Sequence, residues 1–196
     1  MIIDKDFLSE YEKDIVQSDI ITSSYFPWYW TAVSSSDDYP FYCHVMKRRE
    51  DPDTNSIWFE FFFPIIQRFI QKHKIFKGKY EVLRAALNET LSIDENDLQG
   101  DPHVDYKEDH TVFLLYLTNS SGNTNIYKEK WKEGKKPEYL NRDGAKNLET
   151  HASVTPEEGK IICFDGLRYH SANFQKPRER RVVCIFAIKG EQNVVL

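Results

Sequence analysis

The feature that most constrains the fold is a series of short apolar segments in the second half of the chain, separated by turn-forming residues. They cover residues 79–87 (KYEVLRAAL), 111–118 (TVFLLYLT), 160–164 (KIICF) and 181–188 (RVVCIFAI). The segment 111–118 is apolar throughout, which is typical of a strand buried on both faces. Short strands bounded by turn signals such as Gly159 and Gly166 favour an all-β sandwich or barrel. We therefore predict a β core in this half of the chain.

The first half has a different pattern, in which apolar residues recur at helical spacing. This spacing predicts one helix over residues 4–18 and a second over about 58–74. An aromatic cluster at 25–30 (YFPWYW) is expected to pack against the β core. The 196 residues correspond to one domain at a typical ~150 residues per domain. We expect a single domain over 1–196, with a helical N-terminal portion (about 1–78) and a β core (about 79–190).

Charge and apolar content limit the partners that the chain can have. It carries 26 Lys and Arg against 31 Asp and Glu, which gives a net charge of −5. A mildly acidic chain does not attract polyanions in general, so we expect no nucleic-acid partner and no anionic membrane surface. The longest apolar stretch, 59–66, is interrupted by Glu60 and Pro64 and is far shorter than the ~20 residues that cross a bilayer.

Two further features predict a cytoplasmic protein. The N-terminus carries acidic residues early and lacks the long apolar core of a signal peptide. The three cysteines, Cys43, Cys163 and Cys184, are an odd number without metal-type spacing. They are expected to be reduced and mostly buried thiols.

Two histidines and an aspartate form a candidate metal centre. His103 and Asp105 are two residues apart, so on an extended segment both side chains point to the same side. His170 follows the strand at 160–164 and a turn, and it can supply a third ligand. Two imidazoles and one carboxylate leave three open positions on an octahedral ion, the arrangement of non-haem Fe(II) oxygenases. The other histidines are expected to be structural or surface residues: His44, His73, His110 and His151.

Arg181 suggests what else binds near this centre. It begins the last apolar strand, eleven residues after His170, and shares a strand face with Val183 and Ile185. An inward-facing arginine is costly unless it meets an anion. A 2-oxo dicarboxylate fits, because its far carboxylate can accept a guanidinium fork while its near end chelates the metal. Arg180 is the alternative, but Arg181 leads directly into the apolar alternation, so the sequence favours Arg181 as one end of a 2-oxoglutarate site.

The order of these motifs resembles the Fe(II)- and 2-oxoglutarate-dependent oxygenases, and within them the prolyl-4-hydroxylase-like branch with its small phage and bacterial members. The resemblance covers about residues 26–188 and rests on FPWYW, LRAALN, PHVD, FLLYLTN, FDGLRYHS and RRVVCIFAI. It implies a mainly β fold with N-terminal helices, the double-stranded β-helix or jelly roll. It also implies that Tyr116 joins Arg181 in binding the far carboxylate of 2-oxoglutarate. Arg84 and Asn88, on the preceding strand, would face the cosubstrate or the substrate.

The activity implied by the resemblance is hydroxylation of an unactivated C–H bond, with Fe(II), 2-oxoglutarate, O2 and ascorbate as a reductant. The substrate would be a prolyl or other residue in a protein or peptide. Two alternatives stay open: an oxygenase of a small molecule or nucleobase, and a catalytically silent β-helix that binds a metal or a carbohydrate. Because Asp105 is a carboxylate and not a small residue, no position is left for a halide ligand, which argues against halogenation. Ni, Co, Mn or Zn could occupy the same ligands in a purified sample.

The segment 128–139 (KEKWKEGKKPEY) departs from the pattern that the resemblance implies. It carries five lysines, and the stretch 128–148 is longer and more polar than the short hairpin that the resemblance implies. We expect a solvated loop here. The alternative is a mobile lid over the site, anchored by Trp131.

Overall fold

The computed structural model describes residues 1–32, 40–49, 51, 53–91, 99–134, 139–140, 144 and 146–196. Within these ranges the helices are α1 (Glu10–Ile15), the π-helix η1 (Val16–Ile21) and α2 (Trp58–His73). The strands are β1 (Ile2–Asp4), β2 (Tyr29–Thr31), β3 (Phe41–Lys47), β4 (Phe76–Thr90), β5 (Thr111–Tyr116), β6 (Thr124–Lys130), β7 (Thr150–Val154), β8 (Ile161–Asp165), β9 (Arg168–Ala172) and β10 (Arg181–Gln192).

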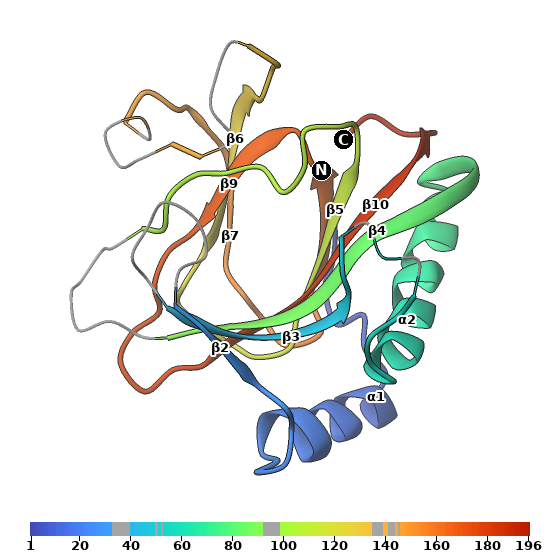
Figure 1. The fold of residues 1–196 in the computed structure, drawn as a ribbon, viewed down its shortest axis with the longest axis vertical. Helices are drawn as coiled ribbons and strands as arrows, with labels where there is room; N and C mark the ends of the chain where they lie inside the picture. Colours follow the sequence, from blue (N-terminus) through green and yellow to red (C-terminus); the bar gives the residue numbers. More distant parts are fainter. Residues whose placement is uncertain are drawn as a thin grey trace.

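The strands form two antiparallel sheets that face each other (Figure 1). The larger sheet has the order β1-β8-β5-β10-β4-β3-β2, and the smaller sheet has the order β7-β6-β9. The chain passes from β5 in the larger sheet to β6 and β7 in the smaller one, then to β8, β9 and β10 in alternation. This crossing between two sheets is the jelly-roll arrangement. The predicted mainly β class with N-terminal helices and a double-stranded β-helix is confirmed.

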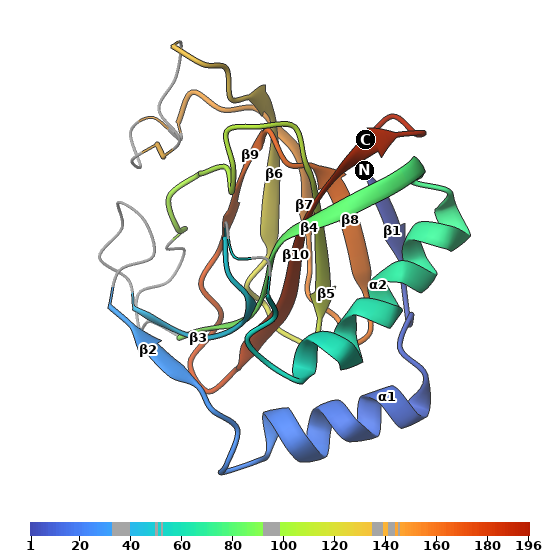
Figure 2. The same ribbon diagram turned by 45° about the vertical axis from the view of Figure 1, so that its right-hand side comes forward.

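The helices cover the outer face of the larger sheet (Figure 2). Strand β5 shows why both faces of this sheet must be apolar, since all six of its residues are buried. Phe113 and Leu115 pack in the cluster that contains the helices, whereas Val112, Leu114 and Tyr116 face the smaller sheet. The predicted burial of 111–118 on both faces therefore has a direct cause: helices lie on one side and the second sheet on the other.

Helix α2 matches its prediction to within one residue at its C-terminal end. Its apolar residues recur at a spacing of three or four, which places them on one buried face. The helix ends at His73, and the next residue, Lys74, has a left-handed φ of 50° that stops the α pattern. No helix in the described ranges is long and apolar enough to span a membrane.

The first helix starts later than predicted. Residues 2–4 form β1, which pairs with β8, and the helix begins only after Ser9. The Ser9 side chain accepts a hydrogen bond from the backbone N–H of Glu12, and the Glu12 carboxylate accepts one from the backbone N–H of Ser9. This capping box fixes the start of α1. The predicted start at residue 4 was wrong because strand pairing with a distant segment takes the first residues.

The portion before residue 78 also contains strands that the sequence did not predict. Strand β3 pairs with β4, and β2 extends the sheet beyond β3 as its edge. The aromatic cluster at 25–30 packs against the core through Phe26 and Trp28. The same prediction was wrong for Tyr25, Tyr29 and Trp30, which are exposed. Tyr29 and Trp30 lie on β2, where an edge strand leaves its side chains open to solvent.

All three cysteines are free and buried, as predicted. Burial raises the pKa of the Cys163 thiol to about 12 and raises that of Cys184 as well. These thiols are protonated at neutral pH and act as small apolar side chains.

Candidate metal centre

A cavity of about 200 Å³ opens between the two sheets. Its wall on the larger sheet comes from alternate residues of neighbouring strands, because side chains two apart on a strand share a face. The smaller sheet and the chain before β5 supply the rest. The lining residues that matter for chemistry are Arg49, Arg84, Asn88, Asp101, His103, Asp105, Thr124, Tyr139, His170 and Arg181.

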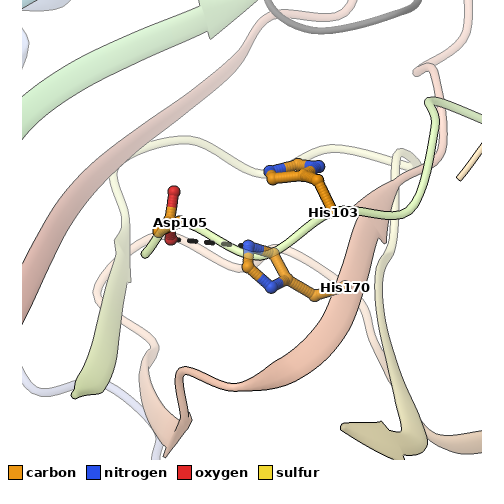
Figure 3. Close-up of side chains that lie close together, drawn as sticks. All are labelled: His103, Asp105 and His170. Atoms are coloured by element: carbon orange, nitrogen blue, oxygen red, sulfur yellow. Dashed lines mark ion pairs between the residues drawn. The ribbon is translucent and has the colours of Figure 1, made fainter. Parts of the chain in front are cut away.

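The chain brings His103, Asp105 and His170 together at this cavity. One possible ligand atom from each lies within 4.8 Å of the others (Figure 3). His103 and Asp105 precede β5, and His170 lies on β9. The backbone N–H of His103 donates to the His170 carbonyl at 2.9 Å, and the His170 N–H donates back at 3.0 Å. This reciprocal pair holds the two imidazoles side by side, with ring centroids 4.6 Å apart.

The hydrogen bonds of the two imidazoles leave one nitrogen of each ready to bind a metal. The Nδ1 atom of His103 lies 3.0 Å from the Asp101 carbonyl, and that of His170 lies 3.2 Å from the Arg168 carbonyl. A carbonyl only accepts, so Nδ1 carries the proton and Nε2 presents its lone pair. A carbonyl partner on the second nitrogen is the usual support of a metal-binding histidine. The donor set therefore fits a divalent transition metal.

Electrostatics favour the protonation states that a metal needs. Burial and the adjacent His103 lower the pKa of His170 to about 4, although Asp105 acts in the opposite direction. Burial alone would raise the pKa of the Asp105 carboxyl. The positive charges of the two imidazoles and of Arg84 outweigh burial and hold that pKa at about 2. At neutral pH the site thus presents a neutral His170 and an ionised Asp105.

Gly166 allows the tight turn from β8 into β9 that delivers His170. A Cβ at this position would lie 2.1 Å from Nε2 of His110, so only glycine fits beneath that imidazole. His110 is buried, and its Nδ1 lies 2.8 Å from the Glu108 carbonyl. It packs on the turn and lies outside the group formed by His103, Asp105 and His170.

The other histidines also lie outside the group. His44 contacts the Pro27 carbonyl and the Ser56 hydroxyl, and His73 pairs with Asp4. His151 lies exposed on β7.

Arg181 lies in the same cavity as a buried cation, with 4% of its surface exposed. Its Nε donates to the Gly122 carbonyl at 2.8 Å and its Nη2 to the Thr124 hydroxyl at 2.7 Å. No carboxylate of the described residues pairs with it, and burial lowers its pKa. An unpaired buried charge is costly, so this guanidinium is suited to an incoming anion.

Arg180 faces a different environment. Its guanidinium forms an ion pair with Glu89 and donates to the Ile21 carbonyl. Arg180 does not line the cavity. The two adjacent arginines therefore point to opposite sides of β10, and only Arg181 is free to meet a ligand.

Thr124 lines the same cavity, and nothing in the sequence pointed to it. Its Oγ1 accepts hydrogen bonds from Arg181 and, at 2.8 Å, from the Tyr116 hydroxyl. A hydroxyl that accepts twice still has its own proton to donate, and Thr124 lines the cavity. Tyr116 is fully buried behind Thr124 and is not part of the cavity wall. No local signal marked Thr124, because it is the first residue of β6 and lies in a run rich in Asn, Ser and Thr.

The segment 128–139 is partly a strand. Its first residues belong to β6, and Trp131 packs against a small cluster of Val104, Tyr127 and Tyr169. Tyr139 stacks on the His103 ring, with centroids 5.9 Å apart, and lines the cavity. Residues 135–138 lie outside the described residues, so the lid alternative stays a prediction for them.

Comparisons with known proteins give similarity in structure alone. No family model matches the chain, and no curated protein matches its sequence. A 2OG-Fe(II) oxygenase family oxidoreductase from Burkholderia pseudomallei superposes with a TM-score of 0.64 at 13% identity, over 96% of this chain and 84% of that one. The epimerase SnoN with Fe3+, alpha ketoglutarate and nogalamycin RO gives 0.66 at 10% identity, over 96% and 78%.

A third similar structure is a prolyl hydroxylase from Trichoplax adhaerens in complex with a hypoxia-inducible-factor peptide. It superposes with a TM-score of 0.58 at 12% identity, over 95% of this chain and 82% of that one. At these identities the likeness establishes architecture and not activity. The chain has the fold of the Fe(II)- and 2-oxoglutarate-dependent oxygenases.

Proposed function

We propose that this protein is an Fe(II)- and 2-oxoglutarate-dependent dioxygenase that hydroxylates an unactivated C–H bond. The observation that carries the proposal is one cavity that holds both a His-Asp-His cluster and a buried arginine without an acidic partner. The fold shared with such oxygenases supports it. Neither feature alone requires this chemistry, but a 2-oxo dicarboxylate needs both of them at once.

The metal ligands are His103, Asp105 and His170. Bound Fe(II) with 2-oxoglutarate and O2 supplies the oxidation, in which one oxygen atom enters the substrate and 2-oxoglutarate becomes succinate and CO2. The carbonyl groups of Asp101 and Arg168 hold the two imidazoles in the tautomer that binds. The low pKa of Asp105 keeps its carboxylate ionised without help from the metal.

Arg181 and Thr124 are suited to hold the far carboxylate of 2-oxoglutarate. Arg181 offers charge and a guanidinium that two hydrogen bonds already orient. Thr124 offers its hydroxyl proton, because both of its lone pairs are taken by Arg181 and Tyr116. In this arrangement Tyr116 acts through Thr124 and does not itself bind the cosubstrate.

The substrate that we propose is a prolyl or other residue of a peptide or protein, with a small molecule as the second candidate. The Trichoplax adhaerens hydroxylase supports the first, since it binds a peptide fragment. SnoN supports the second, since it binds nogalamycin RO. Both folds superpose on nearly the whole of this chain, so the choice depends on side chains at the cavity.

The test is succinate release. Purified protein given Fe(II), ascorbate and 2-oxoglutarate is expected to form succinate, and removal of the metal with a chelator is expected to stop it. Adding Fe(II) back is expected to restore succinate release, whereas Zn(II) is expected to bind the same three residues without any succinate release. A protein that binds metal but forms no succinate under any of these conditions is a silent binding module, and the proposal then fails.

Thr124→Val tests how the far carboxylate is held. Valine keeps the shape of threonine but removes the hydroxyl, so we expect the KM for 2-oxoglutarate to rise about tenfold with the metal still bound. Steady-state succinate release measures this change. Tyr116→Phe is the matched comparison and is expected to raise KM less. An equal or larger effect of Tyr116→Phe would mean that the tyrosine binds the cosubstrate directly.

A further inference from the structure

Arg84 is a second cation in the cavity, and the described residues give it no acidic partner within ion-pair distance. It lies half-buried on β4 and lines the cavity with Asn88 and Thr90, which share its strand face. Arg84 lies opposite Ala187, which lies opposite Val112 at the start of β5, the strand that follows His103 and Asp105, so Arg84 lies toward the end of the cavity that holds these two residues. A half-buried guanidinium that faces a cavity, with no carboxylate of the described residues within ion-pair distance, is suited to an anionic ligand.

The far carboxylate of 2-oxoglutarate cannot be that anion. In the pairing of β4 with β10, Arg181 lies opposite Thr90, whereas Arg84 lies opposite Ala187. Six residues of β-strand separate Thr90 from Arg84, which is about 20 Å at the usual rise per residue. The two arginines therefore stand at opposite ends of the cavity wall, and the metal ligands lie toward the Arg84 end.

Arg49 adds a second cation on the same side. Its guanidinium lies 4.6 Å from the centre of the Tyr106 ring and lines the cavity, while the residue is otherwise exposed. The Tyr106 hydroxyl donates to the Leu83 carbonyl at 3.1 Å. Tyr106 thus links Arg49 to the strand position next to Arg84, and both cations line the cavity that holds His103, Asp105 and His170.

The balance of charge in the cavity leaves these cations in excess. The negative charge of the far carboxylate of 2-oxoglutarate neutralises the positive charge of Arg181. The near carboxylate and Asp105 together neutralise the two positive charges of Fe(II). Asp101 is the one further acid among the described lining residues. Its backbone carbonyl is used by His103. The two positive charges of Arg84 and Arg49 exceed the one negative charge of Asp101. The cavity with metal and cosubstrate bound therefore keeps a net positive charge beside the metal.

We propose that the substrate oxidised at this centre carries a carboxylate, which Arg84 binds and Arg49 attracts at the rim. This inference rests on the proposed function and names the substrate class of the same site. The carboxylate can belong to a free amino or organic acid or to an Asp or Glu side chain of a peptide. The net charge of −5 on the whole chain disfavours a polyanion such as nucleic acid, so the recognition is local.

Asn88 supports a ligand with a hydrogen-bond donor next to that carboxylate. Its Oδ1 is buried and has no partner among the described residues. Asn88 lies between Arg84 and Thr90 on the cavity face of β4. A buried acceptor without a partner is costly, and an N–H or O–H of a ligand would satisfy it.

The experiment compares acids with their neutral amides. The probes are free L-amino acids with the corresponding carboxamides, and the blocked dipeptides acetyl-Pro-Glu-amide and acetyl-Pro-Gln-amide. Calorimetry measures their binding to protein loaded with Ni(II) and 2-oxoglutarate, which cannot turn over. With Fe(II), succinate release and a mass gain of one oxygen report the reaction. At least one acid is expected to bind about tenfold or more tightly than its amide.

Two variants test whether Arg84 is responsible. Arg84→Met keeps the length of the side chain and removes the charge, so the preference for the acid is expected to disappear. Arg48→Met is the control, since Arg48 is an exposed neighbour of Arg49 that does not line the cavity. It is expected to leave the preference unchanged. If the acid is preferred over the amide among the free amino acids, the substrate carboxylate belongs to a free acid. If the acid is preferred in the dipeptide pair, it belongs to a side chain of a peptide.

The outcomes separate this inference from the proposed function. If no acid binds better than its amide, or if Arg84→Met leaves the preference intact, the inference is overturned. It is also overturned if Arg84→Met mainly raises the KM for 2-oxoglutarate in substrate-free succinate release, because Arg84 then serves the cosubstrate. If the wild-type protein releases no succinate under any of these conditions, the proposed function is overturned instead.

Discussion

Replacing Asp105 with alanine is expected to abolish iron binding and succinate release together. Asp105 is the only carboxylate among the three grouped ligands, and its charge is held at neutral pH by a pKa of about 2. Its removal leaves only the imidazoles of His103 and His170 to bind the ion. Changes in the outer partners of metal ligands already cost 10–100-fold in affinity, so loss of a ligand is expected to weaken Fe(II) binding by more than about 100-fold. Competition with a coloured chelator measures the affinity.

The control for this variant is Asp109→Ala. Asp109 is an exposed acid four residues further along the same loop and does not belong to the ligand group. Its replacement is expected to change neither iron binding nor turnover. Circular dichroism of both variants would show that the sheets remain folded. Full activity of Asp105→Ala would mean that the metal lies elsewhere, and both the ligand set and the cosubstrate site would have to be rejected.

The parts of the fold that could be predicted from the sequence are those whose signal is local. The strand at 111–118 is apolar at every position because it is covered on both faces, and α2 repeats apolar residues at helical spacing because one face is buried. The grouping of His103 and Asp105 has the same local character. Two residues apart in an extended chain, they point to one side wherever that chain lies.

The missed strands are those that depend on distant partners. Residues 2–4 become β1 only because β8 offers a free edge, and β6 pairs with β9 between residues as distant as Ile126 and His170, which are 44 positions apart in the chain. The sequences of β6 (TNIYKEK) and β9 (RYHSA) mix polar and apolar residues without regular alternation, so they carry no strand pattern. Thr124 was missed for the same reason. Its role comes from a contact with Arg181, which is 57 positions away in the chain.

The placement of Arg181 in the cavity could be predicted from sequence, because an arginine on the apolar face of a strand is costly unless it meets an anion. The position of Tyr116, which does not line the cavity, could not. Whether Arg180 or Arg181 faces inward is set by the register of β10 against β4 and β5. Sequence alternation fixes the relative orientation of the two residues, but the neighbouring strands fix which face is the cavity.

Replacing Arg181 with methionine is the second change with a large expected effect. Methionine fills a similar volume but has no charge and no hydrogen-bond donors. The far carboxylate of 2-oxoglutarate would therefore lose its two hydrogen bonds to the guanidinium and lie against a buried apolar side chain. Two charge-assisted hydrogen bonds of about 1.5–3 kcal/mol each correspond to a rise in the KM for 2-oxoglutarate of about 100-fold or more. Iron binding is expected to be unchanged, because Arg181 is not among the grouped ligand residues. Succinate release over a range of 2-oxoglutarate concentrations measures the effect.

Arg180→Met provides a matched control one residue away. It breaks the ion pair with Glu89 on the outer side of β10 and leaves the cavity intact, so the KM for 2-oxoglutarate is expected to stay at the wild-type value. Arg181→Lys separates charge from geometry. Lysine keeps the positive charge but cannot form the fork or reach both Gly122 and Thr124, so an intermediate KM is expected. If Arg180→Met raises KM and Arg181→Met does not, the cosubstrate binds on the opposite face of β10, and the cavity between the two sheets has another use.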